Sequence, residues 1–170
     1  MIKAIQGSIV GTRALHRHLE EIAKRLDRGA HVRVGFLASA TYPAGANENK
    51  ILHVAQVAFW NEFGTRRIPS RPFFRTMIDR KSPRWGVGVG NALRKSHYDA
   101  EAALAIVGAS IAGQLKDSIN AWTDPPNSER WAKIKGWDKP LIHTSLMVRS
   151  VDFQVLRGDG GEDTDEYAPH

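Results

Sequence analysis

Apolar residues recur with the period of an α-helix in the first part of the chain. Successive members are four, three and four residues apart, a spacing that places them on one helical face: Leu15, Leu19, Ile22 and Leu26. Thr12 is a suitable N-terminal cap, and Gly29 is a suitable stop. We therefore predict an amphipathic helix that begins near Thr12 and ends before Gly29.

Two short segments instead alternate apolar and polar residues, which is the pattern of a half-buried β-strand. They cover residues 32–36 and 151–156. In each segment the valines and the phenylalanine fall on one side, so each strand offers one apolar face. We expect the two strands to pair with each other.

Residues 51–63 again have a helical pattern, and Gly64 ends it. The apolar stripe of this helix is Leu52, Ala55, Phe59 and Phe63. Packing in the core is the expected role of Trp60 and Phe63, and an interface is the alternative. After a turn made stiff by Pro69 and Pro72, residues 73–81 predict a short helix.

A long helix is predicted from about Asp99 to Trp122. Its stripe is Leu104, Val107, Ile111, Leu115, Ile119 and Trp122. Three residues on this helix are small enough to let another element approach closely: Gly108, Ala112 and Gly113. Residues 82–96 are ambiguous, because Ser82 and Pro83 can open a helix while three glycines weaken it.

These elements predict an α+β fold. We expect a small antiparallel sheet packed against a long central helix and shorter helices, with long loops at 38–50 and 124–139. The length of 170 residues suits one domain with a proper core. Residues 1–157 are expected to form this single domain. Residues 158–170 carry five acids and no Lys or Arg, which predicts a disordered acidic tail.

The net charge of +6 is unevenly placed. Residues 66–95 hold nine Lys or Arg and one acid, so this part can meet a polyanion or an acidic protein surface, or simply be solvated.

The absence of cysteine excludes disulfides and thiol chemistry. No apolar run reaches the ~18 residues of a membrane helix, and the N-terminal residues lack the apolar core of a secretory signal.

The motifs of common enzymes are missing. The seven histidines are scattered without the spacing of a metal site. The glycines of residues 86–90 lack the third glycine of a dinucleotide fingerprint, since Asn91 stands there. No GxSxG motif occurs, and no serine is paired with a particular histidine. We expect no enzymatic activity, no cofactor and no metal.

Several short motifs stand in an order that resembles a known family. They are Tyr42, Pro43 and Gly45, then Asn61–Thr65, Ile68–Phe73, Pro125–Ser128 and Lys139–Thr144. This series is similar to the neck or tail-completion (virion morphogenesis, head-tail joining) proteins of tailed bacteriophages, over about Ala30 to Leu156. The chain departs from the family's pattern at His143, where Asp is usual, and at Ser145, where Gly is usual. Glu129, Arg130 and Trp131 stand where a Thr is common.

The resemblance implies a structural role in the virion. Such proteins form rings, commonly hexameric or matched to the connector, at the junction between the connector and the tail. They join the tail to the head and leave a channel for DNA. The implied partners are further copies of the chain, the connector or adaptor, and tail tube or tail terminator proteins. Assembly would take place in the host cytoplasm, without a membrane.

The residues themselves suggest where a ring contact lies. Arg66, Arg67 and Arg71 are long donors on a restrained corner and can pair with carboxylates of a neighbour. Glu62 is expected to hold Arg66 or Arg67 locally. The remaining candidates for contact with a neighbour or partner are Tyr42, Phe74, Trp131 and Trp137.

A basic group can also face DNA in the channel through phosphates alone. It consists of Arg75, Arg80, Lys81 and Arg84. The alternative function is a basic nucleic-acid-binding protein without sequence specificity. That alternative lacks a recognition helix beside a helix-turn-helix corner and exposed aromatics on a sheet.

Overall fold

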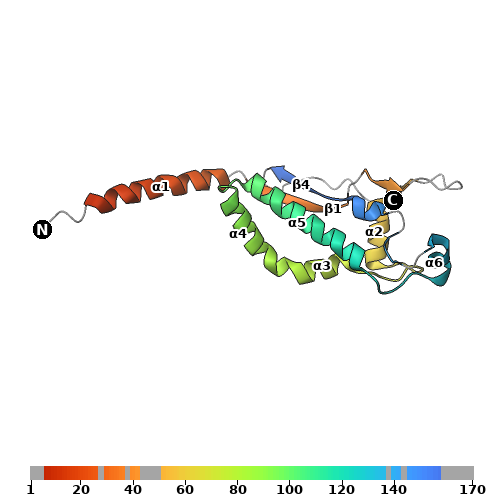
Figure 1. Cartoon of the computed structure of the whole chain (residues 1–170). Coiled ribbons are helices and arrows are strands. Elements are labelled where there is room, and N and C mark those ends of the chain that lie inside the picture. The colour runs from red at the N-terminus through yellow and green to blue at the C-terminus, as the bar shows by residue number, and fades with distance from the viewer. Residues whose placement is uncertain are drawn as a thin grey trace.

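The computed structural model describes residues 6–26, 29–36, 39–42, 51–136, 139–142 and 145–157. The elements in chain order are α1 (Gln6–Leu26), β1 (Ala30–Phe36), β2 (Thr41–Tyr42), β3 (Leu52–His53), α2 (Val54–Phe63), α3 (Phe73–Lys81), the 3-10 turn η1 (Ser82–Arg84), α4 (Trp85–Lys95), α5 (Ala100–Ala121), α6 (Glu129–Lys135), α7 (Leu146–Arg149) and β4 (Val151–Arg157). The fold is α+β, as the pattern of the sequence predicts (Figure 1).

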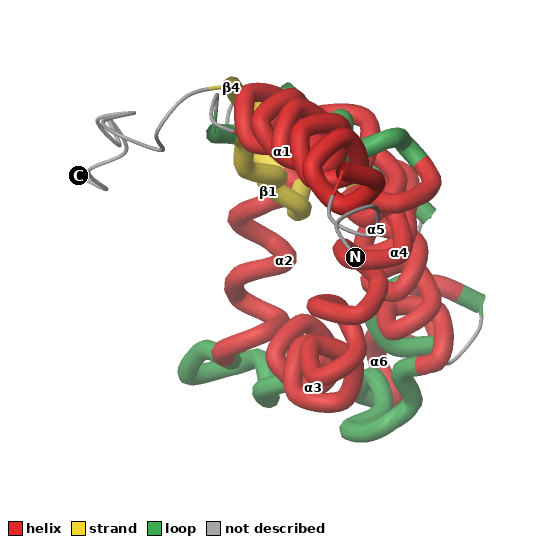
Figure 2. Tube along the Cα trace, turned by 90° about the vertical axis from the view of Figure 1, so that its left-hand side faces the viewer, coloured by secondary structure: helices red, strands yellow, loops and turns green. Residues whose placement is uncertain are grey.

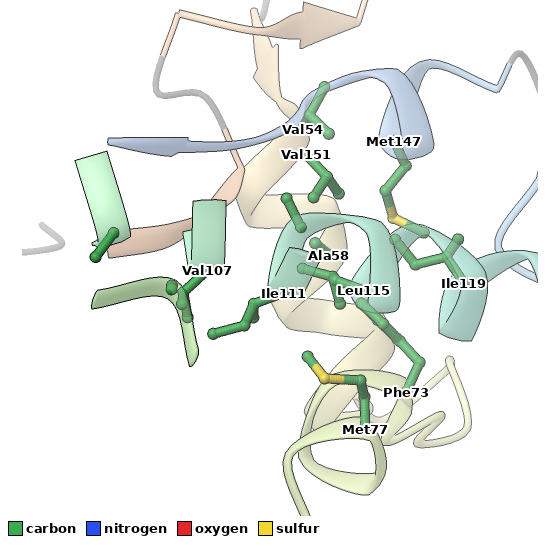
Figure 3. Close-up of a cluster of buried hydrophobic side chains, with 13 residues drawn as sticks. Val54, Ala58, Phe73, Met77, Val107, Ile111, Leu115, Ile119, Met147 and Val151 are labelled. Carbon is green, nitrogen blue, oxygen red and sulfur yellow. The ribbon is translucent and has the colours of Figure 1, made fainter. Parts of the chain in front are cut away.

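Helix α5 is the central element, and the other parts of the body pack around it (Figure 1). The carboxylate of Asp99 caps its first turn by accepting a hydrogen bond of 3.1 Å from the N–H of Ala102. The middle of the predicted stripe is buried as expected. It forms one cluster with side chains of α2, α3, α7 and β4 (Figure 3).

Strands β1 and β4 pair antiparallel, which confirms the predicted pairing. In the register, Val32 stands opposite Val155 and Val34 opposite Phe153. Gly108 of α5 lies against this sheet. A Cβ added at Gly108 would stand 2.6 Å from a ring carbon of Phe153 and 2.7 Å from a methyl carbon of Val32. The glycine is therefore what lets the helix and the sheet approach closely.

Replacing Gly108 with alanine is expected to destabilise the protein by about 1–2 kcal/mol. Overpacking costs about 1–3 kcal/mol, and the better helix propensity of alanine offsets up to about 1 kcal/mol of it. Gly113→Ala is the matched control, because no atom lies within 4 Å of its added Cβ. That control should stabilise the protein by about 0.5–1 kcal/mol. Urea unfolding of both variants measures the difference, and equal stabilities would contradict the close contact.

Helix α2 is present where predicted, but the expected stripe faces outward. Its buried residues are Val54, Ala58 and Glu62, whereas Phe59 and Phe63 are exposed. Sequence periodicity could not choose the face because α2 is apolar on nearly all sides. The buried set also includes a carboxylate, which the pattern would assign to the surface.

Helix α1 begins at Gln6, before the predicted cap, and extends away from the body (Figures 1 and 2). Its apolar stripe exists but is not covered. The side chains of Leu15 and Leu19 are 56% and 53% exposed, Leu26 is exposed, and Ile22 is half-buried. The amphipathic helix that the sequence predicts is therefore present, and in the described structure most of its apolar stripe is left in water.

The ambiguous residues 82–96 form η1 and α4. Trp85 fastens this helix to α5 by donating its indole N–H to the side-chain oxygen of Gln114 at 3.0 Å. Ser145, which stands where Gly is usual in the family that the motifs resemble, has φ 57° and ψ 7° and precedes α7. The predicted loop 124–139 contains α6, and the predicted loop 38–50 contains β2. Trp137, residues 43–50 and the predicted tail 158–170 lie outside the described residues.

Candidate functional site

The corner between α2 and α3 is organised around Glu62. This residue lies on the last turn of α2, and it is only 5% exposed. Its carboxylate accepts hydrogen bonds from the backbone N–H groups of Phe74 at 2.8 Å and Arg75 at 3.1 Å. These N–H groups lie in the first turn of α3 and have no partner within their own helix. Glu62 thus caps α3 from a different helix.

The same carboxylate forms an ion pair with the guanidinium of Arg75, at 2.9 Å from Nε. Arg75 also donates to the backbone carbonyl of Glu62 at 3.1 Å. Glu62 was expected to hold Arg66 or Arg67. Its partner is Arg75 instead, because α3 turns back along the end of α2 and brings its own first turn to the carboxylate.

Arg71 is the residue whose position differs most from the one that the sequence predicted. It was predicted to point toward a neighbouring copy, but it is only 6% exposed. Its guanidinium donates to the carbonyls of Pro125 at 2.9 Å and Pro126 at 2.8 Å, and to the side-chain oxygen of Asn61 at 3.1 Å. Arg71 therefore fastens the loop after α5 to the corner inside one chain.

The tip of the corner is a tight turn held by backbone contacts. Gly64 has φ 77°, and a Cβ there would stand 2.9 Å from the backbone nitrogen of Ser70. The N–H of Thr65 donates to the carbonyl of Ile68 at 2.8 Å. Arg66 and Arg67 lie within this turn and are exposed. Their predicted contact with a neighbouring subunit stays a prediction.

An aromatic surface lies beside the corner. Phe59 and Phe63 are 59% and 53% exposed, and their ring centroids are 4.6 Å apart. The guanidinium carbon of Arg75 lies 4.7 Å from the centroid of the Phe63 ring, a cation–π geometry. Phe59 and Phe63, together with exposed Ala55 one turn before Phe59, form what we call the α2 outer stripe. Sequence reasoning missed that this stripe is exposed. The feature of the sequence that could have indicated this exposure is that α2 is apolar on nearly all sides.

The other predicted contact residues belong to separate elements. Phe73 is buried and Phe74 is half-buried. Tyr42 is half-buried in β2, and burial raises the pKa of its phenol. Trp131 lies in α6. Phe73 and Phe74 contact the corner through their backbone N–H groups, which donate to the carbonyl of Arg71 and to the carboxylate of Glu62.

The predicted DNA-facing group divides in two. Arg80, Lys81 and Arg84 are exposed at the end of α3 and in η1. Arg75 is engaged with Glu62 and Phe63 instead. The other three residues lie further along the chain than Arg75 and form a basic group at the end of α3 and in η1.

A pocket of about 490 Å³ lies where α1 meets the body. Arg25 donates across this joint to the carbonyl of His97 at 2.8 Å. Arg157 pairs with Glu101 at 2.6 Å, and this hydrogen bond raises the pKa of Arg157. The charges that line the joint are thus of both signs. One contact links α1 to the turn after α4, and the other links the end of β4 to the start of α5.

Comparison of the chain with protein-family models, with curated proteins and with solved structures found no match. Within the described residues, no group of three or more His, Asp or Glu side chains is placed to hold a metal ion. The helices of the described part are also not long and apolar enough to cross a membrane.

Proposed function

We propose that this protein is a structural subunit of a phage particle that assembles into a ring at the junction between connector and tail. In this role the ring joins the tail to the head and leaves a channel for DNA. The observation that carries the proposal is the α2 outer stripe. The order of the motifs from Tyr42 to Thr144 supports the same role.

A helix that is apolar on all sides is normally buried on all sides. The inner face of α2 fills the core, while Phe59 and Phe63 on the outer face remain in water. Covering a half-exposed phenylalanine contributes roughly 1 kcal/mol. A neighbouring subunit that covers both rings would therefore gain a contact at no cost to the fold.

The corner makes this surface suitable for assembly because it is rigid. Glu62 and Arg71 fix the ends of α2 and α3 and the Pro125–Pro126 loop relative to one another. Arg66 and Arg67 at the tip can add charge-assisted hydrogen bonds to carboxylates of a neighbour, which fixes orientation. A ring then requires that one such contact repeats after a fixed rotation.

Sedimentation velocity and negative-stain microscopy test the proposal, with the protein alone and with purified tail tubes. We expect rings, or caps on the ends of the tubes. Phe59→Glu should abolish both. Val87→Glu is the matched control, because Val87 is exposed on α4 and lies outside the α2 outer stripe. A wild-type protein that neither forms rings nor caps tubes would overturn the proposal.

The exposed basic surface of Arg80, Lys81 and Arg84 favours a second candidate function, contact with DNA through phosphates. Retention of the protein on immobilised DNA, measured across a salt titration, tests this candidate. Replacement of all three residues by alanine should weaken retention for every sequence alike. A wild-type protein that is not retained at low salt would exclude the contact.

A further inference from the structure

Two apolar helical surfaces of this chain remain in water at opposite ends of the molecule. One is the α2 outer stripe. The other, which we call the α1 stripe, consists of Leu15, Leu19, Ile22 and Leu26. Figure 1 shows α1 extending from one end of the body, with α2 near the other end. The two stripes of one chain therefore do not meet in this structure.

We propose that the α1 stripe of one copy packs on the α2 outer stripe of the next copy. This inference rests on the proposed ring and names the contact that builds it. The occupant of each apolar surface is thus a second copy of the same chain. The contact is heterologous, since two different surfaces meet, and repetition of such a contact generates rings when the rotation closes.

Helix α1 needs a partner on physical grounds. A helix that stands alone in water is marginal, and most helical stability in proteins comes from packing of the apolar face. The 3-and-4 spacing of the α1 stripe is that of helices that pack lengthwise on other helices. At 1.5 Å per residue, the stripe spans roughly 16 Å, and the α2 outer stripe spans roughly 12 Å. The α1 stripe is therefore long enough to cover the α2 outer stripe.

The area available argues for a ring rather than an isolated pair. Half-exposed leucines and phenylalanines each leave on the order of 100 Å² to be covered. The most exposed members are Leu15, Leu19, Leu26, Phe59 and Phe63, so one contact covers roughly 500 Å² of apolar side chain. Stable complexes bury about 1,200 Å² or more. A subunit in a ring makes the contact twice, once with each stripe. The total area that its two contacts bury therefore approaches that range.

A symmetric pair of α1 helices is the main competitor for the same surface. It would cover the α1 stripes of two copies, but it would leave Phe59 and Phe63 in water. The heterologous contact covers both surfaces with one geometry. For this reason we place α2 of a neighbour, rather than a second α1, on the α1 stripe.

Thiol cross-linking can test the contact directly, because the chain has no cysteine. Ala23 lies next to the α1 stripe, Ala55 lies in the α2 outer stripe, and both are exposed. An affinity-tagged Ala23→Cys protein is mixed with an untagged Ala55→Cys protein and treated with a short thiol-reactive linker. Both substitutions are small and keep every leucine and phenylalanine of the two stripes.

Ala14→Cys is the matched control for Ala23→Cys. The two positions are nine residues apart, about two and a half turns, so they lie on opposite sides of α1. We expect the 23–55 product to exceed the 14–55 product at least tenfold. Equal yields, or a tagged protein that links mainly to itself through position 23, would overturn the proposed contact.

A charge in the α1 stripe gives an independent readout. Leu19→Glu should raise the protein concentration needed for assembly at least tenfold, whereas Ala14→Glu should leave it within about twofold. Circular dichroism checks that both variants fold. Rings of the wild-type protein without the 23–55 product would refute this contact and leave the proposed function standing. A protein that stays monomeric at every concentration and does not cap tail tubes would refute both.

Discussion

Replacing Glu62 by alanine is expected to destabilise the protein by about 2–4 kcal/mol. The substitution removes the carboxylate that receives the N–H groups of Phe74 and Arg75 and the guanidinium of Arg75. Loss of a helix cap costs about 1 kcal/mol, and hydrogen bonds to a charged group contribute about 1.5–3 kcal/mol. For a chain of this size, the melting temperature should fall by roughly 5–15 °C.

Two further variants separate the cap from the ion pair. Arg75→Ala should cost at most about 1 kcal/mol, because the side chain of Arg75 is 53% exposed and its pairing is screened by water. The loss of stability in Glu62→Gln should lie between those of Arg75→Ala and Glu62→Ala, because the amide keeps one acceptor oxygen but loses the charge. A Glu62→Ala protein within about 0.5 kcal/mol of wild type by urea unfolding would contradict the central role of this residue.

Replacing Arg71 by alanine is expected to cost about 2–4 kcal/mol as well. The carbonyls of Pro125 and Pro126 would lose their buried donor, and the loop after α5 would lose its link to the corner. Arg71→Lys should recover little, because one ammonium group cannot reproduce a planar fork that spans two carbonyls and an amide oxygen. Urea unfolding measures the loss of stability. Limited proteolysis should show earlier cleavage near residues 123–128.

Arg66→Ala and Arg67→Ala are the controls for Arg71. Both side chains are exposed in the same corner, so each substitution should change stability by no more than about 0.5 kcal/mol. If Arg66→Ala were as destabilising as Arg71→Ala, or Arg71→Ala were neutral, the division of the three arginines into one internal and two external residues would be wrong.

The sequence correctly predicted those elements in which the apolar residues fall on one face alone. Helix α5 has one apolar stripe, and β1 and β4 each have one apolar side, so their positions and their pairing follow from period alone. The small residues of α5 were only partly informative, because Gly108 lies against the sheet while an added Cβ at Gly113 would meet open space. The period of α1 was correct, but a period says only that a face will be covered, and not by which molecule.

The candidate site was less accessible because its contacts join distant residues. Glu62 bonds groups 12 and 13 residues further along the chain. Arg71 bonds carbonyls 54 and 55 residues away. Nothing in the local pattern of a charged residue indicates such partners, and charged residues are ordinarily assigned to the surface. The arginines of the corner therefore looked alike in the sequence and differ only in the fold.

The joint between α1 and the body has a consequence for the size of the assembly. If α1 carries the contact to the next copy, its direction relative to α5 sets the rotation from each subunit to its neighbour. A small change of that direction adds up around the circle, so it changes the number of subunits or converts a closed ring into an open fibre. The hydrogen bond from Arg25 to the carbonyl of His97 restrains this direction. The number of subunits in the ring would thus depend on a polar contact inside each subunit, at the base of the helix that carries the interface.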